Sequence, residues 1–359
     1  MKQKIKEILK EKTHPIILEF LRGIYGSKGL AGAVLFRHSR FLSRFYFFFF
    51  ERTFSRENRA VLVGRSKYYE STNGFFSSSP LLRRNIHRIE KGLIMEPRKP
   101  VFALDYIYET VQAYKSVVNK QNFDKDEMLW AKDVLITYFK TVEDTAVIRH
   151  AKDYFYKEDE VELSCDEISR IPYQSQDRPI IPVSEDSLYQ LFLRRRSVRW
   201  FQDKTIDIKK LETAVKMASL APSACNRQPY KFYISAEKDR AASIAKFADG
   251  TVGWADNIQS IAVIVGDLSC YPHARDRHVI YIDSALAGMQ FMLSLESMGL
   301  SSCPINWPDI EKNELALAQE LSLEPYERPI IMIAIGYAKE SGGIPFSQKK
   351  SSNNLIKWV

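Results

Sequence analysis

The sequence predicts an α+β protein in which a mostly helical region precedes a sandwich of helices and strands. Helix and strand patterns alternate through residues 185–359, whereas residues 1–180 show mainly helical spacing. One segment of the second region, residues 279–298, reads as a helix that is apolar almost all round. A helix of that kind is normally buried, and a buried helix beside buried strands is typical of an α+β sandwich.

The first predicted element is a basic amphipathic helix at residues 34–49. At about 100° per residue, its arginines fall on one stripe and its apolar side chains fall on the opposite side. The arginines are Arg37, Arg40 and Arg44, and the apolar residues are Val34, Leu35, Phe41, Leu42, Phe45, Tyr46 and Phe49. Two interpretations stay open: the helix lies in a membrane interface, or it packs its aromatic face on the rest of the protein.

Further helices are predicted at residues 82–93, 101–118 and 127–149 from the spacing of their apolar residues. Gly92 is the expected stop of the first of them, with prolines beyond it. The segment 171–184 is rich in proline and reads as a linker. We therefore expect a mostly helical region of unknown role before the linker, at 1–180, and one separate domain after it, at 185–359.

Beyond the linker, serines and an aspartate provide helix caps. The expected helices run from Ser184 or Ser187 to Arg195, from Asp207 to Ala218, and from Val279 to Met298, which Gly299 follows. The expected strands are residues 230–235, 261–265 and 330–337.

Charge and cysteine content bound the location and the partners. The net charge of +8 lies in residues 1–60, which hold 13 Lys and Arg against 5 Asp and Glu. A basic end suggests an anionic surface as partner, either a membrane or a nucleic acid, although a solvated basic face explains it equally well. A peripheral membrane contact through residues 1–60 stays open, and no nucleic acid is expected. The four cysteines are far apart, and no secretory signal or membrane span is evident. We expect a cytoplasmic protein, with peripheral contact at the inner face of the membrane left open.

Two polar stretches, about twenty residues apart, carry the side chains that suggest chemistry. The first is R-R-S-V-R-W-F at residues 195–201, and the second is A-P-S-A-C-N-R-Q-P at 221–229. Arginine forks and a serine hydroxyl suit a phosphate group. Serine, asparagine and glutamine side chains suit the polar edge of a planar heterocycle, which needs both donors and acceptors.

The order of these stretches resembles the nitroreductase family over about residues 185–359. R-R-S-V-R-W-F is followed by a helix, by A-P-S-A-C-N-R-Q-P-Y-K-F, by a strand, by a long helix ending in M-G-L-S-S-C-P-I-N-W, and by I-A-I-G-Y-A. The resemblance implies an α/β/α sandwich with a central mixed sheet, bound FMN, and a homodimer with the flavin at the subunit interface. Since the cofactor carries the reaction, no catalytic side chain is expected.

The resemblance also implies roles for individual residues. Arg195 and Ser197 match the phosphate and ribityl contacts, with Arg196 in the same cationic cluster. Arg199 matches a cation near the N1/O2 edge of the flavin. Lys349 or Lys350 matches the basic residue near the C-terminus that closes on the phosphate.

Two further segments match parts of the family's flavin site. The loop that reaches the flavin from the partner subunit matches Pro222, Ser223, Asn226 and Gln228, and the segment whose backbone approaches N5 matches Pro304, Ile305, Asn306 and Trp307. Many members have an acidic residue and a glycine at the last two positions. The asparagine puts the substrate in doubt, and the tryptophan suggests a narrowed pocket.

We therefore expect an FMN-dependent oxidoreductase that takes electrons from NAD(P)H and passes two of them to a nitro, quinone or specialised acceptor by a ping-pong mechanism. Two alternatives stay open. One is a flavin-dependent dehydrogenase or oxidase of a single biosynthetic intermediate, and the other is a non-catalytic, membrane-associated binding module with a residual flavin fold. No metal site is expected, because His273 and His278 do not share a helical face and no acidic ligand set accompanies them.

Overall fold

The computed structural model of the protein describes residues 36–37, 39–49, 54–71, 77–118, 120–157 and 170–359. Cys165 lies outside these residues. The start of the predicted amphipathic helix and the greater part of the basic segment 1–60 also lie outside them. The contacts of the chain separate two units, residues 1–59 and residues 60–359, which are described one by one. The boundary expected near residue 180 stays a prediction from the composition of the linker.

The described part of the first unit contains helix α4 (Arg40–Phe49) and the start of α5 (Ser55–Ser71). Helix α4 lies within the predicted amphipathic segment, and none of its residues is buried. Helix α5 was not predicted; its end in the second unit packs Ala60 and Val61 against Leu268 and Ile280.

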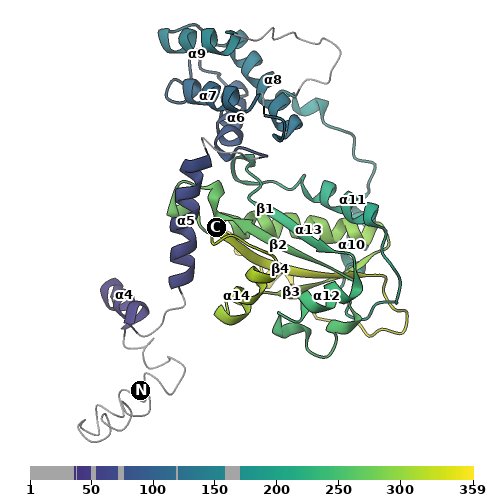
Figure 1. Cartoon of the computed structure of the whole chain (residues 1–359). Coiled ribbons are helices and arrows are strands. Elements are labelled where there is room, and N and C mark those ends of the chain that lie inside the picture. Colours follow the sequence, from purple (N-terminus) through teal and green to yellow (C-terminus); the bar gives the residue numbers. More distant parts are fainter. Residues whose placement is uncertain (1–35, 38, 50–53, 72–76, 119, 158–169) are drawn as a thin grey trace, which may run out of the picture. The chain divides into compact units, whose positions relative to one another are not determined.

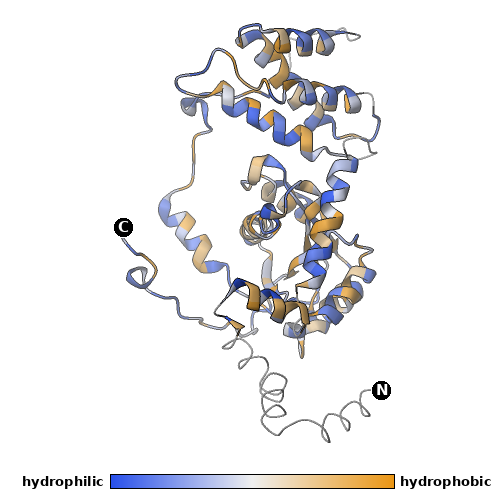
Figure 2. Ribbon diagram, turned by 90° about the vertical axis from the view of Figure 1, so that its left-hand side faces the viewer, coloured by the Kyte–Doolittle hydropathy of each residue, from blue (hydrophilic) through white to orange (hydrophobic). Residues whose placement is uncertain are grey.

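Four helices form the helical region of the second unit: α6 (Pro80–Leu93), α7 (Ile107–Val118), α8 (Lys125–Thr141) and α9 (Ala146–Tyr156) (Figure 1). Hydrophilic and hydrophobic residues alternate along them (Figure 2), and their apolar faces share one core that includes Ile86, Leu135 and Phe155. The prediction of mainly helical structure in this region is confirmed over the described residues.

Two details of the prediction for the helical region are wrong. The expected helix 127–149 is two helices, because Thr145 caps α9 by accepting a hydrogen bond from the Ile148 N–H at 3.2 Å. Gly92 lies inside α6, which ends one residue later. A side chain at that position would meet the ring of Phe102 at 2.2 Å. The glycine therefore serves a close approach between two segments.

Residues 171–184, the predicted linker, contain one short 3₁₀ turn (Ser175–Asp177) and are mostly exposed. Helix α10 (Glu185–Arg194) follows, and Ser184 caps it by accepting from the Ser187 N–H. Helix α11 (Ile208–Ala218) is capped by Asp207, as expected.

The sheet consists of β1 (Tyr230–Ser235), β2 (Ser260–Asp267), β3 (Ser301–Asn306) and β4 (Glu327–Gly336), in the order β1-β2-β4-β3. The remaining helices are α12 (Lys238–Ala245), α13 (Val279–Ser297) and α14 (Glu311–Glu320). All three strand ladders are antiparallel. Among the described residues, parallel pairing occurs at the bridge between Ser197 and Ser302. The expectation of a mixed sheet therefore holds through this bridge alone.

Alternate side chains of the central strands enter two different cores. On β2, Val263 packs with α12 and α14 residues, whereas Ile264 packs with α11 and α13 residues. On β4, Ala334 and Ile335 divide in the same way. This period of two places one helical layer on each face of the sheet (Figure 1). The α+β sandwich is thus confirmed, with α13 buried along one side.

Candidate functional site

The arginine-rich segment lies along strand β3. The Val198 N–H donates to the Ser302 carbonyl at 3.1 Å, and Ser197 forms the parallel bridge with Ser302. Arg195 is the C-cap of α10, so the segment starts where that helix ends. The backbone between α10 and the buried Phe201 is therefore fixed against the sheet.

Two predicted phosphate ligands, Arg195 and Ser197, and the predicted N1/O2 cation, Arg199, act on the Cys303 thiol. Burial raises the pKa of the Cys303 thiol, while the charges of Arg199 and Arg195 and a hydrogen bond from Ser197 oppose that rise. Two guanidinium groups and one hydroxyl therefore act on a single point of β3. Such a donor set fits an anionic phosphate.

Arg199 is held from two sides. Its guanidinium lies over the Trp254 ring, 5.9 Å from the centroid. The Asn257 amide donates to its carbonyl at 2.5 Å and accepts from the Phe201 N–H at 3.3 Å. Neither Trp254 nor Asn257 was singled out in the sequence, where nothing marks them as neighbours of an arginine more than fifty positions away.

Arg196 points to a different partner. Its guanidinium donates to the carbonyls of Pro345, at 3.0 Å, and Phe346. The C-terminal segment is thereby attached beside the arginine cluster. Lys349 and Lys350 follow within this segment, and both are exposed. Arg196 is thus engaged by backbone carbonyls, and the two lysines are exposed on the segment that it holds.

The second predicted stretch, residues 222–228, is a strained turn. Cys225, Asn226 and Gln228 have φ values of 54°, 50° and 49°. A left-handed backbone conformation costs free energy in residues other than glycine, and it persists where the surroundings impose it. Such conformations are concentrated at ligand-binding sites, which agrees with the role that the sequence predicts for this loop.

Hydrogen bonds from within the domain impose this conformation. The Gln228 N–H donates to the Ser223 hydroxyl at 3.1 Å. The Asp283 carboxylate, on α13, accepts from the Ala224 N–H at 2.9 Å. The Gln228 side-chain amide donates to the Ser219 carbonyl at 2.7 Å.

The helical region also contacts the loop, through Arg83 on α6. Its Nε donates to the Asn226 carbonyl at 2.7 Å, and one terminal nitrogen donates to the Gln228 Oε1 at 3.1 Å. The other terminal nitrogen pairs with Glu127 on α8 at 3.0 Å. These bonds to Glu127, Asn226 and Gln228 are called the Arg83 bridge below. No sequence signal could have found it, because its partners are 44 to 145 positions away.

The predicted N5 segment is the end of strand β3. Ile305 is buried, Pro304 is partly buried and Asn306 is exposed. Trp307 is buried in the core on the α12 side and donates from its indole nitrogen to Glu314 at 3.3 Å. The suggestion that its bulk narrows the pocket is therefore wrong, because the side chain packs into the interior.

The two halves of the predicted site lie at opposite ends of α13. The loop is attached to Asp283 in the first turns of that helix, whereas Arg194, beside the arginine cluster, pairs with Glu296 in the last turn at 3.0 Å. Thirteen residues of helix separate the two attachment points, about 20 Å at 1.5 Å per residue. One chain therefore presents these two halves far apart.

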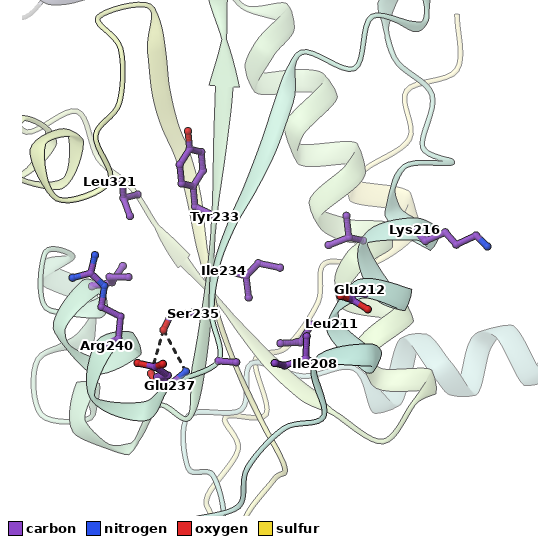
Figure 3. A pocket seen from close by; sticks show the side chains of 13 residues that line it. Ile208, Leu211, Glu212, Lys216, Tyr233, Ile234, Ser235, Glu237, Arg240 and Leu321 are labelled. Atoms are coloured by element: carbon purple, nitrogen blue, oxygen red, sulfur yellow. Dashed lines mark hydrogen bonds between the residues drawn. The ribbon is translucent and has the colours of Figure 1, made fainter. Parts of the chain in front are cut away.

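A groove lies along the edge of strand β1, away from the predicted flavin residues (Figure 3). This groove of about 880 Å³ is lined by Ile208 and Leu211 of α11, by Tyr233 and Ile234 of β1, and by Arg240 of α12, among others. None of the predicted flavin residues is among its lining residues. Within the described ranges, no cluster of three or more His, Cys, Asp or Glu residues could hold a metal ion.

Comparison with known proteins identifies a family for residues 193–337. Residues 193–252 and 236–337 match the model of the Nitroreductase family. A protein of Archaeoglobus fulgidus, provisionally named an NADH dehydrogenase or NAD(P)H nitroreductase, is 27% identical over 42% of this chain and 85% of its own length. An iodotyrosine deiodinase of Haliscomenobacter hydrossis is 24% identical over 50% of this chain and 93% of its own length.

An FMN-dependent nitroreductase from Clostridium difficile R20291 is 22% identical, with a TM-score of 0.38, over 44% of this chain and 91% of that chain. Each of these three relatives is thus matched over most of its length but over at most half of this chain. The family match begins at residue 193, so the helical region with Arg83 and Glu127 lies outside it.

Proposed function

Residues 193–337 of this chain form a domain of the nitroreductase family, and from this premise we propose that the protein is an FMN-dependent oxidoreductase. The observation that carries the proposal is the convergence of Arg195, Ser197 and Arg199 on one point of β3. Arg195 and Ser197 would hold the phosphate, with Arg196 beside them and Lys349 or Lys350 closing over it. Arg199 would place a cation near the N1/O2 edge.

FMN, when bound, supplies hydride and electron transfer at its N5 atom. The proposed donor is NAD(P)H, in keeping with the names of several relatives. NAD(P)H would enter the pocket first, be oxidised to NAD(P)⁺ and leave. A nitroaromatic, quinone or specialised acceptor would then enter the same pocket and gain two electrons. The residues of the chain would bind and orient the cofactor and the substrates. The backbone of Pro304, Ile305 and Asn306 would border the flavin edge that carries N5.

We propose that the active form is a homodimer. The loop with Pro222, Ser223, Asn226 and Gln228 lies about 20 Å along α13 from the arginine cluster of its own chain, so a second copy would have to present it. After its bond to Arg83, the Gln228 Oε1 keeps one lone pair for a ligand.

Exposed apolar residues on α13 support this assembly. Ile282, Leu286 and Met289 are 57%, 43% and 40% exposed, and their spacing places them on one face of the helix. An apolar stripe of this kind, on the helix that joins both half-sites, is a surface that a second copy would cover.

The proposal is tested by the absorption spectrum of the purified protein and by stopped-flow reduction. We expect flavin bands and rapid bleaching by NADH or NADPH under anaerobic conditions, followed by recovery on addition of a quinone. A colourless preparation that does not take up added FMN would refute it.

The alternative of a dehydrogenase or oxidase of one intermediate is favoured by Asn306, which stands exposed where many members have an acidic residue. The same experiment separates the two functions. A flavin that neither NADH nor NADPH reduces, but that reacts with oxygen after reduction by dithionite, would favour the alternative.

We further propose a cytoplasmic protein with a peripheral contact to anionic membranes. Helix α4 has no buried residue, and its Phe41 and Phe48 are 75% and 72% exposed beside Arg40 and Arg44. Apolar burial and basic residues act together at such surfaces. None of the helices in the described ranges is both long and apolar enough to cross a bilayer. Co-sedimentation with anionic vesicles should weaken with salt and in F41S/F48S; protein that stays in the supernatant at low salt would contradict the contact.

A further inference from the structure

The cofactor-binding loop of this chain is in contact with a region that the nitroreductase family match does not include. The match begins at residue 193, whereas Arg83 and Glu127 belong to helices α6 and α8. The three nitrogens of the Arg83 guanidinium bond to three different acceptors, two in the loop and one on Glu127. A planar fork with fixed donor directions makes such a set possible.

The bridge is buried and fully paired on the side of the helical region. The side chains of Arg83 and Glu127 are 14% and 1% exposed. The Glu127 carboxylate also accepts from the Ser78 hydroxyl at 2.6 Å and from the Ser79 N–H at 2.9 Å. The ring of Trp130 lies 5.5 Å from the guanidinium carbon. Glu127 and Trp130 therefore fix the position of the Arg83 side chain independently of its bonds to the loop.

The loop side of the bridge is the strained part of the turn. Arg83 bonds to Asn226 and Gln228, two of the three residues with positive φ. A left-handed backbone needs contacts that impose it, and a charged donor on a carbonyl is among the strongest of these. Arg83 also bonds to the Gln228 Oε1, so Arg83 and the Ser219 carbonyl together set which polar atoms of this side chain remain available to a ligand.

We propose that Arg83 is a positioning residue for the flavin, and that the helical region thereby sets the affinity and the electronic environment of FMN. The inference rests on the proposed function, in which Asn226 and Gln228 contact the polar edge of the flavin. Arg83 does not itself touch the cofactor; it acts through the loop. In a homodimer, the helical region of one subunit would tune the flavin held mainly by the other.

The test uses the full-length protein and the substitution R83K. Lysine keeps a cation for the buried Glu127 carboxylate, but a single ammonium group cannot reproduce the fork to both loop acceptors. Because Arg83 acts through the loop and not on the cofactor, R83K should raise the Kd for FMN by up to about tenfold, the effect of one charged hydrogen bond. The matched control is R88K, in the same helix, because Arg88 contacts Tyr106 at 3.6 Å and Asp105 at 3.8 Å within the helical region.

Measurements at saturating FMN separate positioning from a structural role. The visible spectrum and the midpoint potential of the bound flavin should change in R83K and should match wild type in R88K. The double variant R83M/E127Q removes both charges of the buried pair and should show the same flavin changes, even if R83K folds poorly.

Three results would contradict a positioning role for Arg83. A lowered melting temperature with wild-type FMN affinity, spectrum and potential would make Arg83 purely structural and overturn the inference, while the proposed function stands. Equal effects of R83K and R88K on the flavin would also overturn it. Wild-type protein that does not bind FMN would refute the proposed function and the inference together.

Discussion

Asp283 accepts a hydrogen bond from the Ala224 N–H at 2.9 Å, and this contact ties the loop of the predicted flavin site to the first turns of α13. The other end of the same helix is tied to the arginine segment, through Glu296 and Arg194. One helix, buried along one face, thus sets the distance between two binding elements that lie far apart in the sequence.

Replacement of Asp283 by asparagine should change how stability depends on pH. Burial raises the pKa of Asp283 above its ordinary value of 3.8, against the opposing hydrogen bonds from Ala224 and Tyr271. A raised pKa contributes stability below the ordinary value, and that contribution is lost as pH rises through the raised one. D283N does not titrate there, so its stability relative to wild type should increase from about pH 4 upward. Urea unfolding midpoints of both proteins measure this; a difference that is constant with pH would contradict it. Asp267 and Glu296, whose pKa values burial also raises, titrate in both proteins and cancel.

Replacement of Arg195 by methionine should weaken FMN binding by roughly ten- to a hundredfold, the effect of losing one charged hydrogen bond. Fluorescence titration of the apoprotein gives the Kd. The control is R240M, because Arg240 pairs with Glu320 of α14 and is not among the predicted ligands. The phosphate assignment fails if R195M and R240M bind FMN equally well.

Replacement of Leu286 by arginine should disrupt the homodimer, because it places a charge in the exposed apolar stripe of α13. Light scattering should report a monomer, and FMN affinity should fall with it, since the loop from the second copy is lost. The matched control is L315R: Leu315 is also exposed, at 57%, but lies on α14. A dimeric L286R that binds FMN as wild type would show that this stripe is not the interface.

Replacement of Gly92 by alanine should destabilise the protein despite the better helix propensity of alanine. The added methyl group would meet the Phe102 ring at 2.2–2.8 Å, and overpacking of this kind costs about 1–3 kcal/mol. Gly343 provides the control, since a methyl group there meets nothing within 4 Å, and G343A should change the free energy of unfolding by less than about 0.5 kcal/mol. Equal unfolding midpoints for the two variants would rule out a role for the Phe102 contact.

The elements with strong periodicity or clear caps could be predicted from the sequence. Helices α10 and α11 begin after Ser184 and Asp207 because those side chains accept hydrogen bonds from the first turn. Strand β2 and helix α13 are marked by continuous apolar residues. Strand β3 was not recognised as a strand, because Ser301, Ser302 and Pro304 are poor strand formers, and it exists through its pairing with β4.

The α+β class, the apolar helix 279–298 and the two polar stretches could be recognised in the amino-acid sequence, because each depends on residues close together in the chain. Three contacts became visible in the folded chain alone: Trp307 packs inward, Asn257 holds Arg199, and Arg83 bonds to Asn226 across 143 positions. Periodicity and capping are local, whereas hydrogen bonds between distant segments depend on how the sheet and its helices bring those segments together.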